Sequence, residues 1–434
     1  MTKDDLIEFG RPLREKYFSQ VDSDVYLVNN GANGLAPKNI LDSFQSHILR
    51  DYSWPDRYRK YDYREDYDGA AEEVAKILGT TIENIALGAN VTTLINAVLR
   101  SYPFVKGDKI LVQSNSYPAI LKTVKFVIKQ HELELVELPL NYPLSDDEVV
   151  EKYEEVFKNN NIKLALIDTI SSKPGVKLPY ERLIKLASKY NVLSLVDAAH
   201  GIGLLDLNLD ELQPDFLASD LYKWYYTPRG SALLYVNPKH HKSIHTLPIS
   251  HFYVDGEEEL PKDKEKTRFS DQFNYTGAQL IGALVTVKDA SKFIEEIGGL
   301  QRIKDYNFKL AKQVGEEVSK LWKTQVLENK EGSLVSSLVS VEYPIKEGTI
   351  INESDWETFN IYKLIREGIE KKLIKEFNTT APIFYHNGKI WIRFSAQIYS
   401  GLDDYIESAK LIEKGVDEYL SSNTYKKIIG AATD

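Results

Sequence analysis

The sequence predicts an α/β fold, in which a mostly parallel sheet of the seven-stranded type, flanked by helices, forms a large domain beside a smaller C-terminal α/β domain. Short apolar runs alternate with amphipathic stretches between residues 85 and 236, and this alternation is typical of βαβ units. A second, shorter series of helices and strands begins after Ile297-Gly298-Gly299. We therefore expect an N-terminal helix and turn (1–38), a large domain (39–296) and a small domain (297–434).

The elements are expected in this order. A charged helix is expected over 2–18, a strand at 25–28, a helix that begins at Pro37 and another that ends at Gly79, because proline favours a first helical turn and glycine a helix end. Strands are expected at 85–87, 109–112, 133–140, 164–168, 193–197, 215–219 and 232–236, and helices between them at 91–100, 118–130, 145–158 and 180–190. The charged stretch 254–266 is expected to be a mobile loop. Further on we expect helices at 280–293, 303–321, 356–372 and 405–420, and strands at 338–342 and 390–394.

The composition restricts the classes of function. The formal net charge is −10, which argues against a nucleic acid or an anionic membrane as partner, because both require basic patches. Cysteine is absent, which excludes disulfides, thiolate metal sites and a cysteine nucleophile. The N-terminus is too polar for a signal peptide, and no apolar run approaches the roughly 18 residues of a membrane span. A cytosolic location is therefore expected.

Lys223 is the strongest candidate for chemistry, in the run Ser219-Asp220-Leu221-Tyr222-Lys223-Trp224. Upstream, the apolar run 193–196 ends in Asp197, so this carboxylate should lie at the carboxyl edge of the sheet, where open α/β sheets bind ligands. Desolvation of a lysine at that edge favours its neutral, nucleophilic amine. Pyridoxal phosphate requires such an amine and a carboxylate for its pyridinium nitrogen. Taken singly, a solvated lysine and a helix-capping aspartate are the ordinary alternatives.

A phosphate site is expected in the segment Gly88-Ala89-Asn90-Val91-Thr92-Thr93, which joins a strand to a helix. Its small residues allow close backbone approach, and the helix N-terminus provides free N–H groups and a partial positive charge near Val91. The Thr92 hydroxyl adds a further donor. The alternative is that Asn90 merely caps the helix.

Two ring-bearing residues could contact the cofactor. Tyr117 could stack on a flat ring, although it could also be one half-buried tyrosine among 27. His200 follows Asp197 by three residues, and could contact the phenolic oxygen of the cofactor or act as an acid or base. A solvent-facing histidine at a helix start is the alternative.

Substrate contacts are expected from four residues. Arg393 lies on an expected strand in which apolar and polar residues alternate. Its guanidinium could bind a substrate carboxylate through two parallel hydrogen bonds, or form a structural salt bridge. Arg229 could bind a phosphate or carboxylate, or lie on the surface. Asn30 and Ala32 could reach the substrate from an N-terminal turn, or simply form that turn. No metal site is expected, because the histidines at 240, 241, 245 and 251 lack the spacing of a zinc-protease helix.

These segments together resemble a known family. The runs Asp197-Ala198-Ala199-His200, Ser219 to Trp224 and Thr227-Pro228-Arg229-Gly230-Ser231 are similar to those of class V aminotransferases, a group of fold-type I pyridoxal-phosphate enzymes. The similarity is greatest to the isopenicillin N epimerase-like branch, which includes fungal hercynylcysteine sulfoxide lyases. It spans about residues 25–290, with Arg393 as an outlying match.

The resemblance implies a role for each matching residue. Lys223 would hold the cofactor covalently, and Asp197 would pair with its ring nitrogen. His200 and Tyr117 would contact the ring of the cofactor, and Val91, Thr92 and Ser219 would bind its phosphate. Arg393 would bind the substrate α-carboxylate. The family is typically homodimeric, and Phe273-Asn274-Tyr275-Thr276-Gly277-Ala278 resembles the segment that reaches the neighbouring subunit's site, with Thr276 as a phosphate contact.

Two positions depart from the family pattern. The residue before the lysine is usually histidine in this branch, and here it is Tyr222. The segment that reaches the neighbouring subunit usually continues with threonine and then an acidic residue, and here Ala278 and Leu280 stand at those places. The first change concerns proton chemistry beside Lys223, and the second concerns the cross-subunit phosphate contact.

The absence of cysteine separates the reactions of the relatives. Cysteine desulfurases need a catalytic cysteine to carry sulfur, so that mechanism is excluded. A lyase needs no thiol, and we expect β-elimination from a cysteine-derived amino acid or its sulfoxide, giving pyruvate and ammonia. Epimerisation or transamination on the same cofactor is the alternative within the family. A non-catalytic scaffold is the alternative of another class, although a scaffold would need neither Asp197 nor Lys223.

Overall fold

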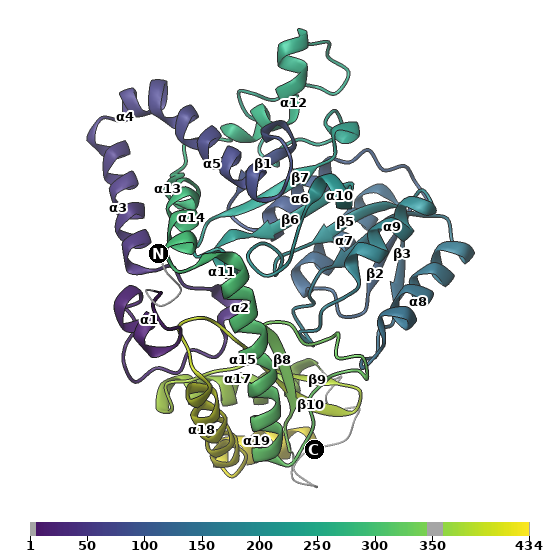
Figure 1. The fold of residues 1–434 in the computed structure, drawn as a ribbon. Coiled ribbons are helices and arrows are strands. Elements are labelled where there is room, and N and C mark those ends of the chain that lie inside the picture. Colours follow the sequence, from purple (N-terminus) through teal and green to yellow (C-terminus); the bar gives the residue numbers. More distant parts are fainter. Residues whose placement is uncertain (1–5, 345–358, 434) are drawn as a thin grey trace.

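The computed structural model describes residues 6–344 and 359–433 (Figure 1). It contains a seven-stranded sheet in the larger part of the molecule and a three-stranded sheet in the smaller, C-terminal part. The predicted fold class, a large mostly parallel sheet with a smaller C-terminal α/β part, is therefore confirmed.

The large sheet has the strand order β1-β7-β6-β5-β4-β2-β3. Its strands are β1 (Ile85–Gly88), β2 (Lys109–Gln113), β3 (Glu134–Leu138), β4 (Ile162–Asp168), β5 (Leu193–Asp197), β6 (Phe216–Asp220) and β7 (Ala232–Val236). Strands β3, β2, β4, β5 and β6 run parallel, whereas β7 pairs antiparallel with both β1 and β6. Because parallel strands end at the same edge, β4, β5 and β6 present their last residues side by side.

Helices cover both faces of this sheet (Figure 1). One apolar cluster contains side chains of α6 (Val91–Ser101) and α7 (Pro118–His131). The other contains side chains of α5 (Tyr63–Ile77), α8 (Asp146–Asn159), α9 (Tyr180–Lys189) and α14 (Val287–Glu296). Since both faces are covered, every residue of β6 and β7 is buried, which explains their continuous apolar runs.

The small sheet consists of β8 (Leu338–Glu342), β10 (Lys389–Ser395) and β9 (Ile383–His386), in the order β8-β10-β9 with antiparallel pairing. Among the residues that the structure describes, the helices of this part are α15 (Gly299–Trp322), α17 (Phe359–Glu376), α18 (Leu402–Leu420) and α19 (Asn423–Thr433). A separate apolar cluster joins the sheet to these helices. The remaining α-helices are α1 (Arg11–Tyr17), α2 (Asn30–Asn33), α3 (Lys38–Ser53), α4 (Pro55–Arg57), α10 (Leu209–Leu212), α11 (Leu221–Trp224), α12 (Lys262–Asn274) and α13 (Gly282–Val285).

The N-terminal segment differs from its prediction. The first helix begins only at Arg11, after Gly10 with φ 92°, and residues 1–5 lie outside the described part. Residues 25–28 form no strand; instead Tyr26 bridges Thr379, and Asn29 bridges Ser395 beside the small sheet. A strand-like run thus makes single contacts with another part of the chain instead of joining a sheet.

Three further predictions need correction. The expected mobile loop 254–266 is partly helical, because α12 begins at Lys262; there the Arg268 guanidinium is buried against the Glu265 carboxylate and the carbonyls of Asp255 and Glu258. The expected helix 280–293 is divided into α13 and α14. Strand β9 was not predicted, because a four-residue strand that follows Pro382 lacks a clear pattern. The start of the helix expected at 356–372 lies outside the described residues.

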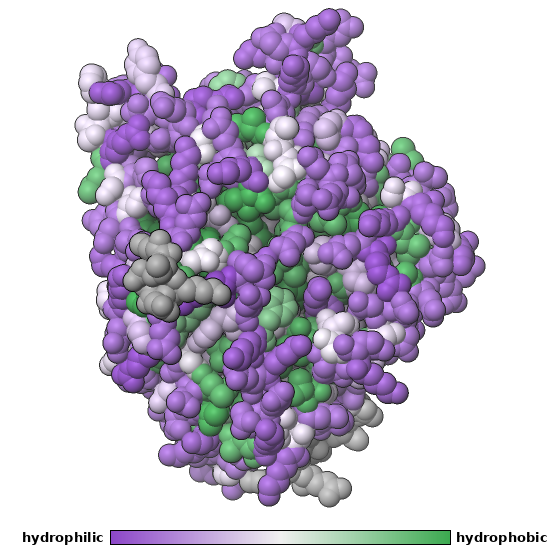
Figure 2. All heavy atoms as spheres, in the orientation of Figure 1, coloured by the Kyte–Doolittle hydropathy of each residue, from purple (hydrophilic) through white to green (hydrophobic). Residues whose placement is uncertain are grey.

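Hydrophilic residues cover most of the face seen in Figure 2, and apolar residues show mainly between them. Within the described part of the chain, no helix combines the length and apolarity that crossing a bilayer requires.

Candidate active site

A cavity of about 940 Å³ opens at the carboxyl edge of the large sheet. Its walls come from strand ends β4, β5 and β6, from the first turns of α6 and α7, from the α2 turn, and from α17 and β10 of the smaller part. Eight of the predicted site residues line it, namely Ala32, Val91, Thr92, Tyr117, Asp197, His200, Lys223 and Arg393. The sheet edge therefore brings together residues that are far apart in the sequence.

Asp197 and Asp168 form a pair of buried carboxyl groups at the ends of neighbouring strands. They are partners in the parallel register of β4 and β5, and both line the cavity. Burial raises the pKa of Asp197 to about 6, against the opposing effects of the Ala199 N–H and the Lys223 ammonium. Burial, and then the neighbouring Asp197, raises the pKa of Asp168 well above its usual range. Asp168 is thus the member of the pair that more readily keeps its proton, and Asp197 is the one that more readily carries the charge.

Replacing Asp168 by asparagine should stabilise the cofactor-free protein increasingly as pH rises. The folded pKa of Asp168 is raised above its unfolded value, so folding takes up a proton at any pH between the two. In that window the wild type loses about 1.4 kcal/mol of unfolding free energy for each pH unit, and asparagine removes this loss. Thermal unfolding of both proteins from pH 5 to pH 8 should show a widening Tm difference in favour of Asp168→Asn. A constant or shrinking difference would contradict the raised pKa of Asp168.

Lys223 lies in the short helix α11, and the N-terminal turn fixes its position. The Asn30 amide donates to the carbonyl oxygen of Lys223 at 3.0 Å. Gly34 has φ 62°, and a Cβ atom there would lie 1.9 Å from the carbonyl oxygen of Tyr222, so only glycine permits this approach. Asn30 itself is buried behind the lysine and does not line the cavity. The turn predicted to contact substrate therefore supports the Lys223 backbone, while Ala32 lines the cavity together with Asn29, Gly31 and Asn33.

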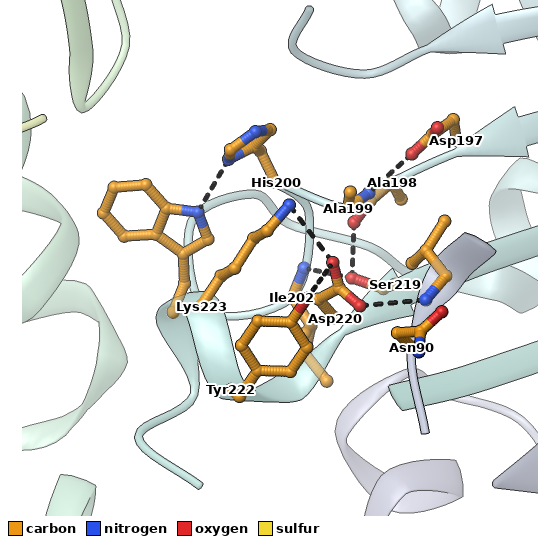
Figure 3. Close-up of polar contacts among 12 residues, drawn as sticks. Asn90, Asp197, Ala198, Ala199, His200, Ile202, Ser219, Asp220, Tyr222 and Lys223 are labelled. Carbon is orange, nitrogen blue, oxygen red and sulfur yellow. Dashed lines mark hydrogen bonds and ion pairs between the residues drawn. The ribbon is translucent and has the colours of Figure 1, made fainter. Parts of the chain in front are cut away.

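Asp220, to which the sequence analysis gave no role, is the polar centre of the site (Figure 3). The Lys223 ammonium lies 3.1 Å from one carboxylate oxygen, which also accepts from the Tyr222 hydroxyl at 3.2 Å. The other oxygen accepts from the Val91 N–H at 2.9 Å. Burial, and then Asp220, raises the pKa of Tyr222, the residue that departs from the family's histidine. One carboxylate thus links the reactive lysine to the first turn of α6.

The first turn of α6 offers donors for a phosphate. Asn90 caps the helix by accepting from the Thr93 N–H at 2.9 Å, so the structural alternative for Asn90 is realised. Thr92 faces the cavity. Ser219 is fully buried and does not line the cavity; its hydroxyl donates to the Ala198 carbonyl oxygen at 2.5 Å and accepts from the Ile202 N–H at 3.0 Å. The position of Ser219 therefore does not support a direct contact between its hydroxyl and a phosphate.

His200 is buried and its ring orientation is fixed. The Trp224 indole N–H donates to His200 Nδ1 at 3.1 Å, so the ring proton resides on Nε2. Burial, and then the positive charges of Lys223 and Arg393, lowers the pKa of His200 well below its usual value. A neutral imidazole with its proton on Nε2 can donate a hydrogen bond to a phenolic oxygen, which favours that predicted role over acid catalysis. Tyr117 lines the cavity with 45% of its surface exposed, as a stacking ring requires.

Arg393 is a buried cation without a carboxylate partner among the described residues. It is 2% exposed, and its guanidinium donates to Asn29 Oδ1 at 3.1 Å and to the Ser172 carbonyl oxygen. Burial lowers its pKa to about 10. The salt bridge considered as the alternative is not formed within the described part of the chain, and an unpaired buried charge is costly. A carboxylate ligand would neutralise it.

Besides Asn30 and Ser219, two further predicted residues lie outside the cavity. Arg229 is exposed and close enough to Tyr222 to affect its pKa, but it does not line the cavity. Thr276 is partly buried, and its hydroxyl donates to the Gln279 side-chain oxygen at 3.5 Å. Its expected role concerns a second subunit and stays a prediction. No group of three or more histidine or acidic side chains suited to a metal ion occurs within 6–344 and 359–433.

The residues of the cavity fit pyridoxal phosphate, with one opposing charge. Lys223 and Asp197 face the same cavity, Tyr117 and His200 offer a stacking ring and a donor, and the α6 terminus suits a phosphate. The Asp220 carboxylate already accepts the hydrogen bond of the Val91 N–H, so a phosphate bound at the α6 terminus would lie near a second anion.

The substitution Asp220→Asn should therefore strengthen cofactor binding. Removing one of two like charges at the α6 terminus should lower the dissociation constant of pyridoxal phosphate about tenfold, which corresponds to about 1.4 kcal/mol. Fluorescence titration of the cofactor-free protein measures this constant, and Asp210→Asn on α10, outside the cavity, is the control. Unchanged or weaker binding by Asp220→Asn would show that the carboxylate does not oppose the phosphate.

The large and small sheets, with a lysine and an aspartate facing one cavity at the carboxyl edge, define the fold-type I class of pyridoxal-phosphate enzymes. The chain belongs to the class V aminotransferase family, because the family model described as "Aminotransferase class-V" matches residues 25–354. The family resemblance inferred from the segments around Asp197 and Lys223 is thus confirmed, and the protein is an enzyme of this family.

Curated relatives match nearly the whole chain. Hercynylcysteine sulfoxide lyase of Schizosaccharomyces pombe is 28% identical, over 93% of this chain and 97% of the relative. An L-cysteine desulfhydrase-like protein of Epichloe uncinata is 26% identical, over 96% and 97%. A probable chloroplastic L-cysteine desulfhydrase of Arabidopsis thaliana is 26% identical, over 90% and 83%. These relatives are named for C–S bond chemistry.

Solved structures share the fold. Apo cysteine desulfurase from Thermococcus onnurineus NA1 has a TM-score of 0.69 at 20% identity, covering 93% of this chain and 98% of that chain. The cystine C–S lyase in complex with its product cysteine persulfide has a TM-score of 0.67 at 16% identity, covering 92% and 98%. At these identities the likeness concerns the fold.

Proposed function

We propose that the protein is a pyridoxal-phosphate-dependent C–S lyase that cleaves a cysteine-derived amino acid or its sulfoxide by β-elimination. The observation that carries the proposal is the arrangement of Lys223, Asp197 and Arg393, which has no carboxylate partner among the described residues, around one cavity, in a chain that contains no cysteine. The curated relatives named for C–S chemistry support it.

Each residue has a distinct task in this proposal. When bound, pyridoxal phosphate supplies an electron sink for negative charge at the substrate Cα. Asp197 holds a proton at the ring nitrogen of that group, and Thr92 binds its phosphate. Arg393 binds the substrate α-carboxylate, and the Lys223 amine removes the α-proton. The C–S bond breaks with its electron pair on sulfur, and addition of water to the remaining enamine gives pyruvate and ammonia.

Two further sets of carboxyl groups affect these residues: Asp220 contacts Lys223, and Asp168 neighbours Asp197. The Asp220 carboxylate lies 3.1 Å from the Lys223 ammonium, and this ion pair holds the lysine side chain in place. The raised pKa of Asp168 favours its protonated form and so leaves Asp197 as the carboxylate that faces the ring nitrogen. The wider proposal includes a homodimer, with Thr276 reaching the site of the second copy, and a cytosolic location.

The experiment that tests the function is product analysis. Protein loaded with pyridoxal phosphate is incubated with L-cysteine, L-cystine and S-alkyl cysteine sulfoxides, and pyruvate, ammonia and the released sulfur compound are quantified. Equal amounts of pyruvate and ammonia support the lyase. Racemised substrate, or keto-acid exchange without pyruvate, would instead support the epimerase or aminotransferase reading. A colourless protein that neither binds the cofactor nor turns over any substrate would support a scaffold.

A further inference from the structure

A set of charged side chains in the cavity has no task in the proposed reaction. Lys173 follows β4, and Arg366 and Glu370 lie on successive turns of α17; all three line the cavity together with Arg393. Three of these four residues are cationic. The single carboxylate, Glu370, lies 3.6 Å from the Arg366 guanidinium. Counted over these four residues, the wall carries more positive than negative charge.

Lys173, like Arg393, has no carboxylate partner among the described residues. No carboxylate oxygen of the described residues lies within 4.0 Å of its amine. Burial lowers its pKa to about 8; Arg366 and Arg393 act in the same direction, and Glu370 opposes them. A partly buried ammonium beside two guanidinium groups is unfavourable unless an anion joins it. Arg393 can neutralise only the substrate α-carboxylate, so Lys173 calls for a second anionic group.

We propose that the substrate is a cysteine S-conjugate whose sulfur substituent carries a carboxylate, and that Lys173 and Arg366 bind this distal carboxylate. The inference rests on the proposed function, because it specifies the substrate class of that reaction. Free cysteine has one carboxylate and would leave Lys173 unbalanced. The cavity, at about 940 Å³, lies in the range of pockets that hold drug-sized ligands, and so has room for a conjugate beside a cofactor.

The test compares two probes that differ in one charge. The sulfoxide of S-(2-carboxyethyl)-L-cysteine carries the distal carboxylate, and the sulfoxide of the matching carboxamide has nearly the same shape without the charge. For the loaded wild type, kcat/KM for pyruvate release should be at least tenfold higher with the carboxylate. The spectral dissociation constant of each probe is measured in parallel, so that the preference can be read independently of turnover.

Variants assign the preference to Lys173. Lys173→Gln and Arg366→Gln should each reduce the preference to threefold or less, through KM, without changing kcat/KM for the carboxamide more than threefold. Lys177→Gln, in the same loop but outside the cavity, should keep the wild-type preference. Lys173→Arg should retain it too, because arginine keeps the charge.

The pH profile provides a readout that a merely structural role would not change. Arg366 and Glu370 on α17 and Arg393 on β10 are the charged groups that face Lys173, and of these groups Lys173 is the one expected to lose its charge above pH 8. The wild-type preference should therefore decline above pH 8, whereas that of Lys173→Arg should persist.

The outcomes separate this inference from the function on which it rests. Pyruvate from both probes at equal kcat/KM, or equal dissociation constants for both, would overturn the distal carboxylate site and leave the lyase standing. Preferential binding of the carboxylate without pyruvate would support the site and contradict the lyase. A preference that survives in Lys173→Gln would also overturn the assignment.

Discussion

Lys223→Ala should lose at least a thousandfold in kcat for pyruvate release, together with the visible absorbance of the lysine-bound cofactor. The amine is expected both to hold the cofactor and to move the α-proton, and a positioned proton-transfer group alone contributes about a hundredfold to ten-thousandfold. Steady-state kinetics and an absorbance spectrum measure the two effects. Among the described residues the Lys223 side chain makes a single ion pair, to Asp220, so the variant should fold.

Lys177→Ala is the matched control for this substitution, because Lys177 lies outside the cavity; it should keep both colour and activity. Circular dichroism of all three proteins verifies that they are folded. Substantial pyruvate release by a folded Lys223→Ala protein would remove the lysine from the reaction.

Asp197→Asn should lower kcat by roughly two to three orders of magnitude. Asparagine has nearly the same shape, but it cannot carry the negative charge that stabilises a proton on the ring nitrogen. Removing one partner of a buried charge pair costs about 3–5 kcal/mol, and each 1.36 kcal/mol is a factor of ten in rate. Measurement of kcat at saturating cofactor separates this loss from weaker cofactor binding.

Asp168→Asn provides the comparison within the same cavity. Its carboxyl group ends the neighbouring strand in register with Asp197, and burial and Asp197 raise its pKa well above the usual range, so the same substitution should lower kcat less than tenfold. Equal losses in the two variants would show that charge at position 197 is not what matters.

The sheet and the main pair of site residues could be predicted from the sequence. Buried parallel strands must be apolar on both faces, so each appears as a short apolar run, and a polar residue at its end marks the ligand-binding edge. Asp197 was found in this way, and Lys223 from its aromatic neighbours. Residue type and spacing were sufficient, because both residues follow directly from strands that could be located.

The role of Asp220 was not predicted, because its position in the sequence also fits an ordinary helix cap. It ends β6 and also precedes α11, so an aspartate there looks like an ordinary helix cap. Its actual contacts reach the Val91 N–H and the Lys223 amine, and the first of these lies 129 positions away in the chain. The useful signal was that three neighbouring parallel strands all end in aspartate.

The cationic wall of the cavity could not be predicted from spacing. Lys173, Arg366 and Arg393 come from the loop after β4, from α17 and from β10, and sequence periodicity does not report how distant elements pack. The bridges of Tyr26 and Asn29 to the smaller part were missed for the same reason. Isolated contacts of this kind produce no periodic pattern of residues in the sequence.

The most direct test of the account is to locate the cofactor on the chain. The protein is loaded with pyridoxal phosphate, reduced with borohydride, digested and mapped by mass spectrometry. The account predicts one phosphopyridoxyl group on Lys223, in the peptide that contains Tyr222 and Trp224. A group on another lysine, or none on any peptide of a protein that remains folded, would contradict it.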